Sequence, residues 1–350
     1  MNSSSGLAGT VAPRRRTVSK ALRARSGGRD LLTPAMLLAP PLALFLLMIV
    51  GPILQSLWIS LYDWDGTGPA TWVGFDNYRE LFADGQFYVS LKNNAIWLVF
   101  FLLAPIIGLA LALFLNQKLP EMRLIKSLFF MPLVLAPVIV GVVFTWFYEP
   151  SFGVIAIAFR AIGLTPPAIL SNETTVTFGI IAAALWAQVA FCLVLFLAGL
   201  SQLDGEMIAA ARLDGADGWP LFRHIVLPQL RPVAFTATIL TVIMSLRNFD
   251  MISVMTQGGP YGTSTVLAYQ MFDATIFSFR AGYGAAIATV LFAIMSVYIA
   301  AFLWHSLRQE ARERLCTQPR SSSRRRRRAS PIGSRSTPPS LSGWRPSSPS

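Results

Sequence analysis

The chain has 350 residues, of which 54% are hydrophobic and only 13% are charged. A soluble domain usually has about 25% charged residues, so this chain has too few to cover a water-exposed surface. Its 29 Lys and Arg exceed its 17 Asp and Glu, but they gather at the two chain ends rather than over a folded surface, so nucleic acid is not an expected partner. Two cysteines cannot form a disulfide framework or a four-ligand zinc site, and no metal site is expected.

Six apolar runs are long enough to cross a bilayer, which takes about 20 residues in a helix. Because only a helix satisfies its own backbone hydrogen bonds in lipid, the predicted fold is an all-α, polytopic membrane protein. Prolines in the first three runs predict kinks or helix ends. The six predicted spans cover residues 36–61, 95–115, 127–148, 176–200, 233–256 and 284–306.

The basic residues predict the orientation of these spans. Of the 29 Lys and Arg, 24 lie before the first span, after the second, after the fourth or after the sixth. Such a bias places those segments, and both termini, in the cytoplasm. The predicted organisation is a basic N-terminal segment at 1–34, a six-span domain at 35–306 and a disordered tail at 307–350. In the tail, Arg324 to Arg328 either meet anionic membrane lipid or are simply solvated.

The predicted cytoplasmic loop at 201–232 is longer than a connector needs to be. It favours a first helix at 206–213, which ends before Gly215 because glycine tolerates a left-handed backbone. The stretch 219–227 predicts a second short helix, which Pro228 would end. We therefore expect a helix-turn-helix along the membrane face, between spans four and five.

This loop resembles the cytoplasmic signature of the permease subunits of ABC importers. That signature runs Glu-Ala-Ala, three residues, Gly, nine residues and Ile-x-Leu-Pro. Ala209 stands where the signature has its glutamate, and the nearest carboxylate is Glu206, one helical turn earlier. The other residues that match or flank the signature are Ala210, Ala211, Asp214, Gly215, Trp219, Ile225, Leu227 and Pro228.

Two further stretches extend the resemblance over about residues 36–306. Residues 73–78 are similar to the entry to span two in the carbohydrate-uptake branch. Residues 248–286, with Gly258-Gly259-Pro260, resemble the first permease of a pair, as in maltose and glycerol-phosphate importers. The departure at Ala209 implies that the loop docks its ATPase without the usual glutamate contact, or with Glu206 in its place.

The resemblance implies the partners and the activity. No GxxxxGK[ST] phosphate loop occurs in the sequence, so the chain is not expected to be an enzyme or to bind ATP itself. The resemblance implies two separate ATPase subunits that bind ATP, a second permease and an external solute-binding protein. Together they would move a sugar or polyol across the cytoplasmic membrane of a bacterium or archaeon by alternating access.

Polar residues within the apolar runs are the candidates for the substrate path, because ionisable groups at membrane depth are costly. They are Gln188 in span four and Arg247, Asn248 and Asp250 in span five. The alternative is that Arg247 and Asp250 simply pair near the outer interface. Two adjacent residues, Asn93 and Asn94, are expected to cap span two.

Two other classes of membrane protein agree less well with the sequence. An ion-coupled secondary transporter would also have six spans, but it has no need of the loop spacing at 201–232, and no inverted repeat is visible. An intramembrane hydrolase would need a nucleophile and a base at membrane depth, and neither HExxH nor GxSxG occurs.

Overall fold

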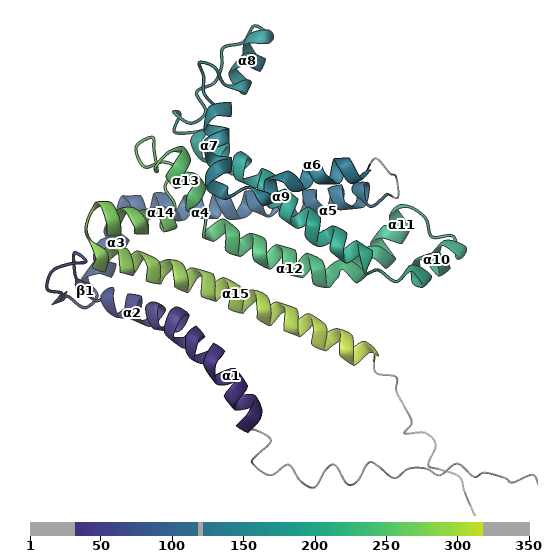
Figure 1. Cartoon of the computed structure of the whole chain (residues 1–350), viewed down its shortest axis with the longest axis horizontal. Coiled ribbons are helices and arrows are strands. Elements are labelled where there is room, and N and C mark those ends of the chain that lie inside the picture. The colour runs from purple at the N-terminus through teal and green to yellow at the C-terminus, as the bar shows by residue number, and fades with distance from the viewer. Residues whose placement is uncertain (1–31, 118–121, 318–350) are drawn as a thin grey trace, which may run out of the picture. The chain divides into compact units, whose positions relative to one another are not determined.

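The computed structural model describes residues 32–117 and 122–317, and every structural statement below concerns these residues. They are almost entirely helical (Figure 1). Five helices are long and apolar enough to cross a membrane, and one bent pair brings the total to as many as six. The predicted all-α, polytopic class is therefore confirmed. Contacts divide the chain into a unit ending at Val297 and a second one beginning at Tyr298.

The elements follow one another in the order of the predicted spans. In chain order they are α1 (Leu32–Phe45), the π-helical turn η1 (Leu46–Val50), α2 (Gly51–Ile59), β1 (Tyr62–Asp63), β2 (Thr71–Trp72), α3 (Asp76–Ala83), α4 (Gly85–Phe101), α5 (Leu103–Leu115), α6 (Met122–Val134), α7 (Pro137–Phe147), α8 (Val154–Ala161), α9 (Val176–Ser201), α10 (Gly205–Leu213), α11 (Trp219–Leu221), the π-helical turn η2 (Phe222–Val226), α12 (Leu227–Leu246), α13 (Asp250–Met255), α14 (Leu267–Phe272), the π-helical turn η3 (Asp273–Phe277) and α15 (Ala281–Thr317).

Two of the prolines that lie inside spans come shortly after a π-helical turn. Pro52 follows the π-helical turn η1 by two residues, and Pro228 follows η2 in the same way. A proline ring clashes with the carbonyl four residues earlier in a regular helix. A π-helical turn shifts the hydrogen bonds by one residue, as in the bond from Leu227 N–H to Phe222 O. The wider turn gives the ring room, so each helix continues.

The second helix predicted in the loop at 201–232 is therefore not a separate element. Instead of ending at Pro228, it runs without a break into α12, and the helical segment Trp219–Leu246 has 28 residues. A helix, a turn and a second helix are present as predicted, but the predicted end of the second helix at Pro228 is wrong, and only α10 is a free-standing short helix. The fifth span also ends earlier than 256, because the helix breaks after Leu246 and resumes as the short α13.

The third predicted span is two helices rather than one. Helices α6 and α7 are bent by 103° at the break between them. Ala136 is extended, with φ −61° and ψ 142°, because a residue that precedes proline is disfavoured in the helical region. Pro137 then begins α7 as its first residue, where its missing N–H costs nothing.

The C-terminal part of the described chain differs from the prediction. Helix α15 continues to Thr317, so the stretch 307–317 is helical rather than disordered. Its Leu, Arg, Gln, Glu and Ala residues are strong helix formers, which explains the extension. The basic N-terminal segment up to residue 31, and the tail from 318 with its run of arginines, lie outside the described residues.

Close helix packing forms the interior around α9. A Cβ on Gly108 of α5 would lie only 2.6 Å from Cβ of Cys192 on α9, so these helices approach at a distance that only glycine permits. A Cβ on Gly199 would lie 2.8 Å from a methyl group of Val233 on α12. Helix α9 is thus held tightly between α5 and α12, which sets the position of its polar residue Gln188.

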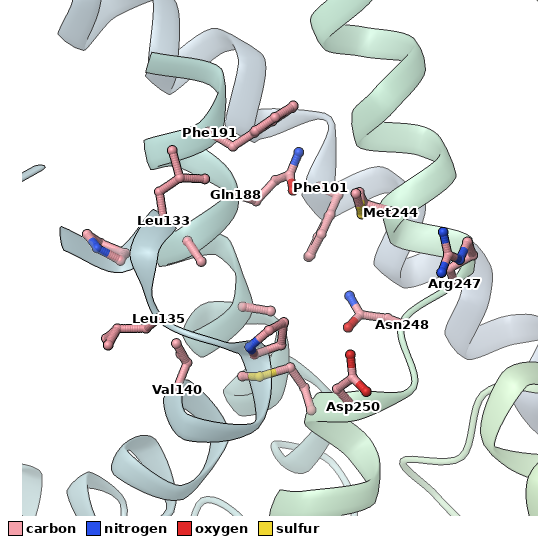
Figure 2. Close-up of a pocket in the computed structure, with 15 residues that line it drawn as sticks. Phe101, Leu133, Leu135, Val140, Gln188, Phe191, Met244, Arg247, Asn248 and Asp250 are labelled. Atoms are coloured by element: carbon pink, nitrogen blue, oxygen red, sulfur yellow. The ribbon is translucent and has the colours of Figure 1, made fainter. Parts of the chain in front are cut away.

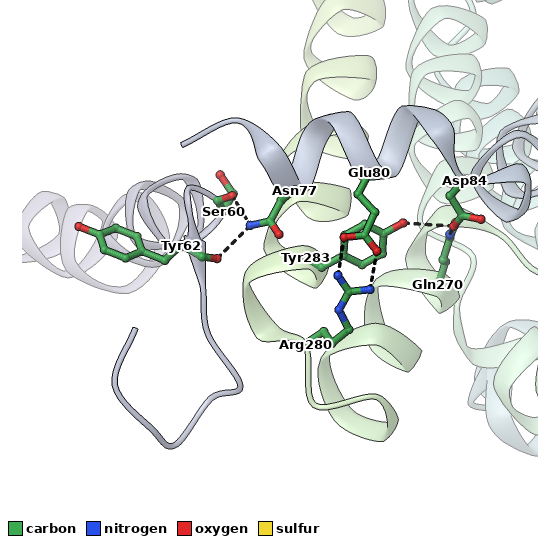
Figure 3. A network of polar contacts seen from close by, with 8 residues as sticks. All are labelled: Ser60, Tyr62, Asn77, Glu80, Asp84, Gln270, Arg280 and Tyr283. Carbon is green, nitrogen blue, oxygen red and sulfur yellow. Dashed lines mark hydrogen bonds and ion pairs between the residues drawn. The ribbon is translucent and has the colours of Figure 1, made fainter. Parts of the chain in front are cut away.

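The β1–β2 hairpin marks one end of the bundle, called here the hairpin end; the opposite end carries α10 and is called the α10 end. Tyr62 pairs with Trp72 in an antiparallel register. Nδ2 of Asn77 on α3 donates to the carbonyls of Ser60 and Tyr62, both at 2.9 Å (Figure 3). This buried amide fixes the hairpin to α3.

An ion pair and a carboxylate that accepts two hydrogen bonds also stabilise the hairpin end (Figure 3). Arg280 donates to both carboxylate oxygens of Glu80, with Nη1 at 2.7 Å from Oε1. These hydrogen bonds lower the pKa of Glu80 below its ordinary value of 4.5. Oδ2 of Asp84, the residue that caps α4, accepts from Gln270 and from Tyr283, each at 3.1 Å. The hairpin end is thereby tied to α14 and α15.

Candidate functional site

A cavity of about 280 Å³ lies between α4, α6, α7, α9, α12 and α13. Most of its lining is apolar, including Phe101, Val140 and Phe191. Four polar residues also line it, and they are the four that the sequence singles out for the substrate path: Gln188, Arg247, Asn248 and Asp250 (Figure 2). A mostly apolar pocket with a few convergent polar groups is the usual form of a small-molecule site.

The break between α12 and α13 places three of these residues. Arg247 and Asn248 lie between the two helices, and Asp250 is the first residue of α13. Asn248 and Asp250 carry their polar atoms toward the cavity, whereas Arg247 lies at its edge (Figure 2). No ion pair joins Arg247 to Asp250 in the described part of the chain. The alternative prediction of a simple pair is therefore wrong in this structure.

Gln188 lies deeper than the other three, with an exposed fraction of 8%. Its Nε2 donates to Oγ1 of Thr241 on α12 at 2.9 Å, and Cys192 Sγ lies 3.5 Å from the same hydroxyl. A buried polar group needs such a partner because desolvation without one is costly. Gln188 therefore has two roles open to it: it bonds α9 to α12, and it contributes polar surface to the cavity.

Asn93 and Asn94 have a role that the sequence did not predict. Both lie well inside α4, which begins eight residues before Asn93 and is capped by Asp84 instead, so the prediction that they cap span two is wrong. Nδ2 of Asn93 donates to the carbonyls of Thr263 and Thr265, at 2.7 and 2.8 Å. The sequence signal that could have indicated this role is the pair of adjacent asparagines directly before the second apolar run.

Asn94 links three helices, α4, α12 and α14, next to the break that follows α12. Its Oδ1 accepts the N–H of Leu267, the first residue of α14, at 2.9 Å. Its Nδ2 points to the carbonyl of Leu246, the last residue of α12, at a long 3.5 Å. Leu246 directly precedes the break that carries Arg247 and Asn248. Asn94 thus satisfies backbone groups that a helix end leaves without partners.

The loop at 256–266 presents one aromatic side chain outward. Tyr261 is 91% exposed, and its backbone has a positive φ of 48°. The surrounding loop is held firmly: Nε2 of Gln86 donates to Gly262 O at 2.9 Å, and Ser264 Oγ donates to Gly259 O at 2.7 Å. Tyr261 is therefore exposed on a loop whose backbone is held by hydrogen bonds.

At the α10 end, the signature residues form an exposed surface. Asp204 caps α10, since its Oδ1 accepts the N–H of Glu206 at 2.9 Å. Gln229 joins α10 to α12, because its Oε1 accepts the N–H of Asp204 at 3.3 Å. The exposed members are Glu206, Ala209, Ala210, Asp214, Gly215 and Trp219, whereas Ala211, Ile225, Leu227 and Pro228 are half-buried.

Gly215 shapes this surface through its backbone. Its φ of +85° lies in the left-handed region, and a Cβ there would meet nothing within 4 Å. It follows the end of α10, where the N–H of Ala216 returns to the carbonyl of Ala211 at 2.9 Å. Leu213 and Trp219, on either side of this turn, are 90% and 66% exposed. The turn therefore presents two largely exposed apolar side chains.

Comparisons with known proteins agree with these features. The family model for "Binding-protein-dependent transport system inner membrane component" matches residues 104–310. A probable ABC transporter permease protein of Pyrococcus horikoshii is 32% identical over 282 residues, which are 79% of this chain and 96% of that protein. The alpha-glucoside transport system permease protein AglF of Rhizobium meliloti is 32% identical over 322 residues, 89% of each chain.

A solved structure shows the same fold. The crystal structure of a bacterial ABC transporter involved in the import of the acidic polysaccharide alginate has a chain that matches with a TM-score of 0.70 and 24% identity, covering 80% of this chain and 96% of that one. The family match spans α5 to α15 and includes the α10 surface and all of the cavity lining except Phe101. The chain therefore belongs to the family of inner membrane components of binding-protein-dependent transport systems, and is a multi-pass membrane permease.

Proposed function

We propose that the chain is the first permease of an importer that takes up a sugar or a related polyol through the cavity between α9 and α12. The observation that carries this proposal is the convergence of Gln188, Asn248 and Asp250 on one cavity at a break in a membrane span. These groups are suited to the hydroxyl groups of a carbohydrate, because the amides of Gln188 and Asn248 both donate and accept hydrogen bonds and the carboxylate of Asp250 accepts them.

The relatives support a carbohydrate substrate. AglF is described as an alpha-glucoside permease, and the solved alginate transporter imports a polysaccharide. The cavity of about 280 Å³ lies near the lower end of small-molecule sites, which begin at about 300 Å³. It therefore suits one sugar residue at a time. The segment at 258–260 supports the first-of-pair assignment through its Gly-Gly-Pro sequence.

The proposed driving force comes from two ATPase subunits that bind ATP and dock on the α10 surface. Closure of the ATPase dimer would move α10 and the exposed start of the fifth span at Trp219. Glu206, one turn before Ala209, supplies the nearest carboxylate to this contact. A second permease would complete the path, and an external binding protein would deliver the solute at the hairpin end, with both termini in the cytoplasm.

The test is to purify the complete importer, reconstitute it in vesicles and measure solute uptake with ATP inside or outside. ATP-driven uptake that needs the binding protein supports the proposal. Uptake that collapses when an ionophore removes the proton or sodium gradient, with ATP still present, would instead indicate an ion-coupled secondary transporter. The solute that most stimulates the ATPase identifies the substrate.

A further inference from the structure

A second cavity, of about 370 Å³, lies at the hairpin end between α2 and the start of α15, and it shares no lining residue with the substrate cavity. Its lining is mostly apolar. Ala281, Ala285 and Ala288 lie on one face of α15, and Pro52 and Ile59 of α2 also line it. We call this cavity the apolar part of the cleft.

The first span, which borders this cleft, is poorly covered by the described chain. No residue of η1 or α2 is buried. Leu54 and Trp58 of α2 are each 59% exposed. A large exposed apolar surface marks contact with a membrane or with another protein. The cleft between α2 and α15 therefore adjoins a helix that needs a further contact.

An aromatic part of the cleft, of about 430 Å³, lies beside the apolar part. Three rings line it, those of Trp58, Tyr62 and Trp64. The two parts share Gln55, Ile59 and Trp64 as lining residues, so they adjoin. Both volumes fall within the range of small-molecule sites.

The rings of the aromatic part are held in place by contacts within the chain. The rings of Trp58 and Tyr62 have centroids 5.7 Å apart, and Trp72 packs on both of them, at 5.9 and 5.1 Å. Nε1 of Trp64 donates to Gly68 O at 2.9 Å. The aromatic surface is thus formed before any ligand binds.

The charge of the surrounding hairpin favours a cation. Residues 59–75 include Asp63 and Asp65 but no Lys or Arg. Oδ1 of Asp65 accepts the N–H groups of Gly68 and Thr67, at 2.7 and 2.9 Å, and these bonds lower the pKa of Asp65 below its ordinary value of 3.8. Aromatic faces also attract cations, and ammonium groups are bound in this way by clustered rings.

The position of the cleft favours a lipid over a soluble cation. Trp58 lies one residue before the end of the first span, and tryptophan there marks the level of the lipid head groups. From Ile59 the apolar part follows α2 back to Pro52, about 10 Å along the helix. Arg280 adds no net positive charge nearby, because Glu80 binds it.

We propose that the cleft binds one phospholipid with an ammonium head group, of the phosphatidylethanolamine type. The ammonium group lies among Trp58, Tyr62 and Trp64, and one acyl chain follows the apolar part between α2 and α15. The lipid fills the gap and fastens the first span to the sixth. The inference rests on the proposed function only for the leaflet, since the proposed orientation makes the hairpin end the outer one.

The first test addresses the head group. The complete importer is purified in detergent, stripped of lipid and titrated with phosphatidylethanolamine or with phosphatidylglycerol of the same acyl chains, and bound lipid is counted by native mass spectrometry. We expect phosphatidylethanolamine to bind at least tenfold more tightly and Trp58→Leu to abolish this preference. Trp146→Leu changes a similarly exposed tryptophan on α7 and should keep it.

The second test addresses the acyl chain. Ala288→Phe fills the apolar part, whereas Ala293→Phe places the same ring on the exposed face of α15. We expect Ala288→Phe to weaken phosphatidylethanolamine binding at least tenfold and Ala293→Phe to change it less than twofold. Added phosphatidylethanolamine should raise the unfolding temperature of the wild type and of Ala293→Phe, but not that of Ala288→Phe, which separates a lost site from a misfolded permease.

Four outcomes would overturn the lipid site. Equal binding of the two lipids, or an unchanged preference in Trp58→Leu, would exclude the ammonium site. Binding by Ala288→Phe within twofold of wild type would exclude the acyl site. Displacement of the lipid by an equal concentration of free choline would indicate a soluble ammonium ligand. Loss of the second permease in Ala288→Phe, with lipid binding unchanged, would show that a protein helix fills the cleft.

These measurements do not depend on transport. An importer that binds the lipid as expected but shows no ATP-driven uptake would contradict the proposed function and support the lipid site. An importer that takes up solute but shows no lipid preference would support the proposed function and contradict the lipid site.

Discussion

The two ends of the bundle are held together in different ways. At the α10 end, α10 is capped by Asp204 and joined to α12 through Gln229, while most of its residues are exposed. At the hairpin end, the loop at 256–266 is fastened by buried amides from α4. The difference is one of exposure: the α10 end leaves a surface open, whereas the amides that hold the loop are buried within the chain.

The largest expected effect concerns the backbone at the α10 end. Gly215→Val forces a β-branched residue into a left-handed backbone, which costs about 1–3 kcal/mol. Because a Cβ meets nothing within 4 Å there, the effect comes from the turn and not from a clash. We expect ATP-driven uptake in vesicles to fall more than tenfold. Gly205→Val is the matched control, with equally open space but an ordinary φ.

Normal uptake by Gly215→Val would contradict the docking role of the α10 surface. An equal loss of uptake in Gly205→Val would show that any larger side chain on α10 is harmful. The left-handed turn at Gly215 would then have no special role in docking. Co-purification of the ATPase subunits distinguishes a lost docking surface from a misfolded permease.

A second prediction concerns the cavity. Asn248→Leu removes an amide that faces it, and we expect the apparent KM for the solute to rise about tenfold, which corresponds to about 1.4 kcal/mol. Met244→Leu, at the same lining, keeps an apolar side chain and should change the KM less than twofold. The measurement is the solute dependence of uptake. An unchanged KM for Asn248→Leu would exclude contact between this residue and the solute.

A smaller effect is expected at the outer ion pair. Because Arg280 lowers the pKa of Glu80, the pair stabilises the fold above the unfolded value near 4.5 and loses this contribution as the pH falls through the folded value. Both side chains are about half exposed, so the contribution is about 0.2–1 kcal/mol. Arg280→Gln should lower the unfolding temperature at pH 7 but not at pH 3.

The control for this pair is Arg79→Gln, which breaks a more exposed ion pair with Asp76. It should change the unfolding temperature less at either pH. Equal shifts for the two variants would show that the Glu80–Arg280 pair contributes nothing beyond an ordinary surface contact.

The smallest effect is expected at the departure from the signature. Ala209 is exposed on α10, and glutamate has nearly the helix propensity of alanine, so Ala209→Glu should be tolerated and should change uptake less than twofold. Glu206→Ala tests whether the neighbouring carboxylate replaces the signature residue. A strong loss for Ala209→Glu would mean that the docking partner needs the small side chain.

The sequence predicts most of what depends on local pattern. The apolar runs give the spans, and the polar residues inside them, Gln188, Asn248 and Asp250, do share a cavity. Helix boundaries at prolines were harder: Pro228 continues a helix because a π-helical turn precedes it, while Pro137 allows a bend of 103°. Proline alone does not say which of these outcomes its neighbours permit.

The role of Asn93 could not be predicted because its partners are distant in the chain. It donates to Thr263 O, 170 residues away, and that pairing exists only once α4 and the loop have packed together. Asparagine in an apolar run signals a buried polar contact, but the periodicity of the run does not name its partner. The same holds for Asp84, which meets Gln270 and Tyr283.

The uninterrupted helix from Trp219 to Leu246 has a mechanical consequence. Its 28 residues form a rod of about 42 Å, with the exposed tryptophan at one end and the break that carries Arg247 at the other. No hinge loop lies between the place where force would enter and the place where the solute would sit. A rotation applied at the first turn would be carried along one continuous helix, whose least regular part is the π-helical turn Phe222–Val226 followed by Pro228.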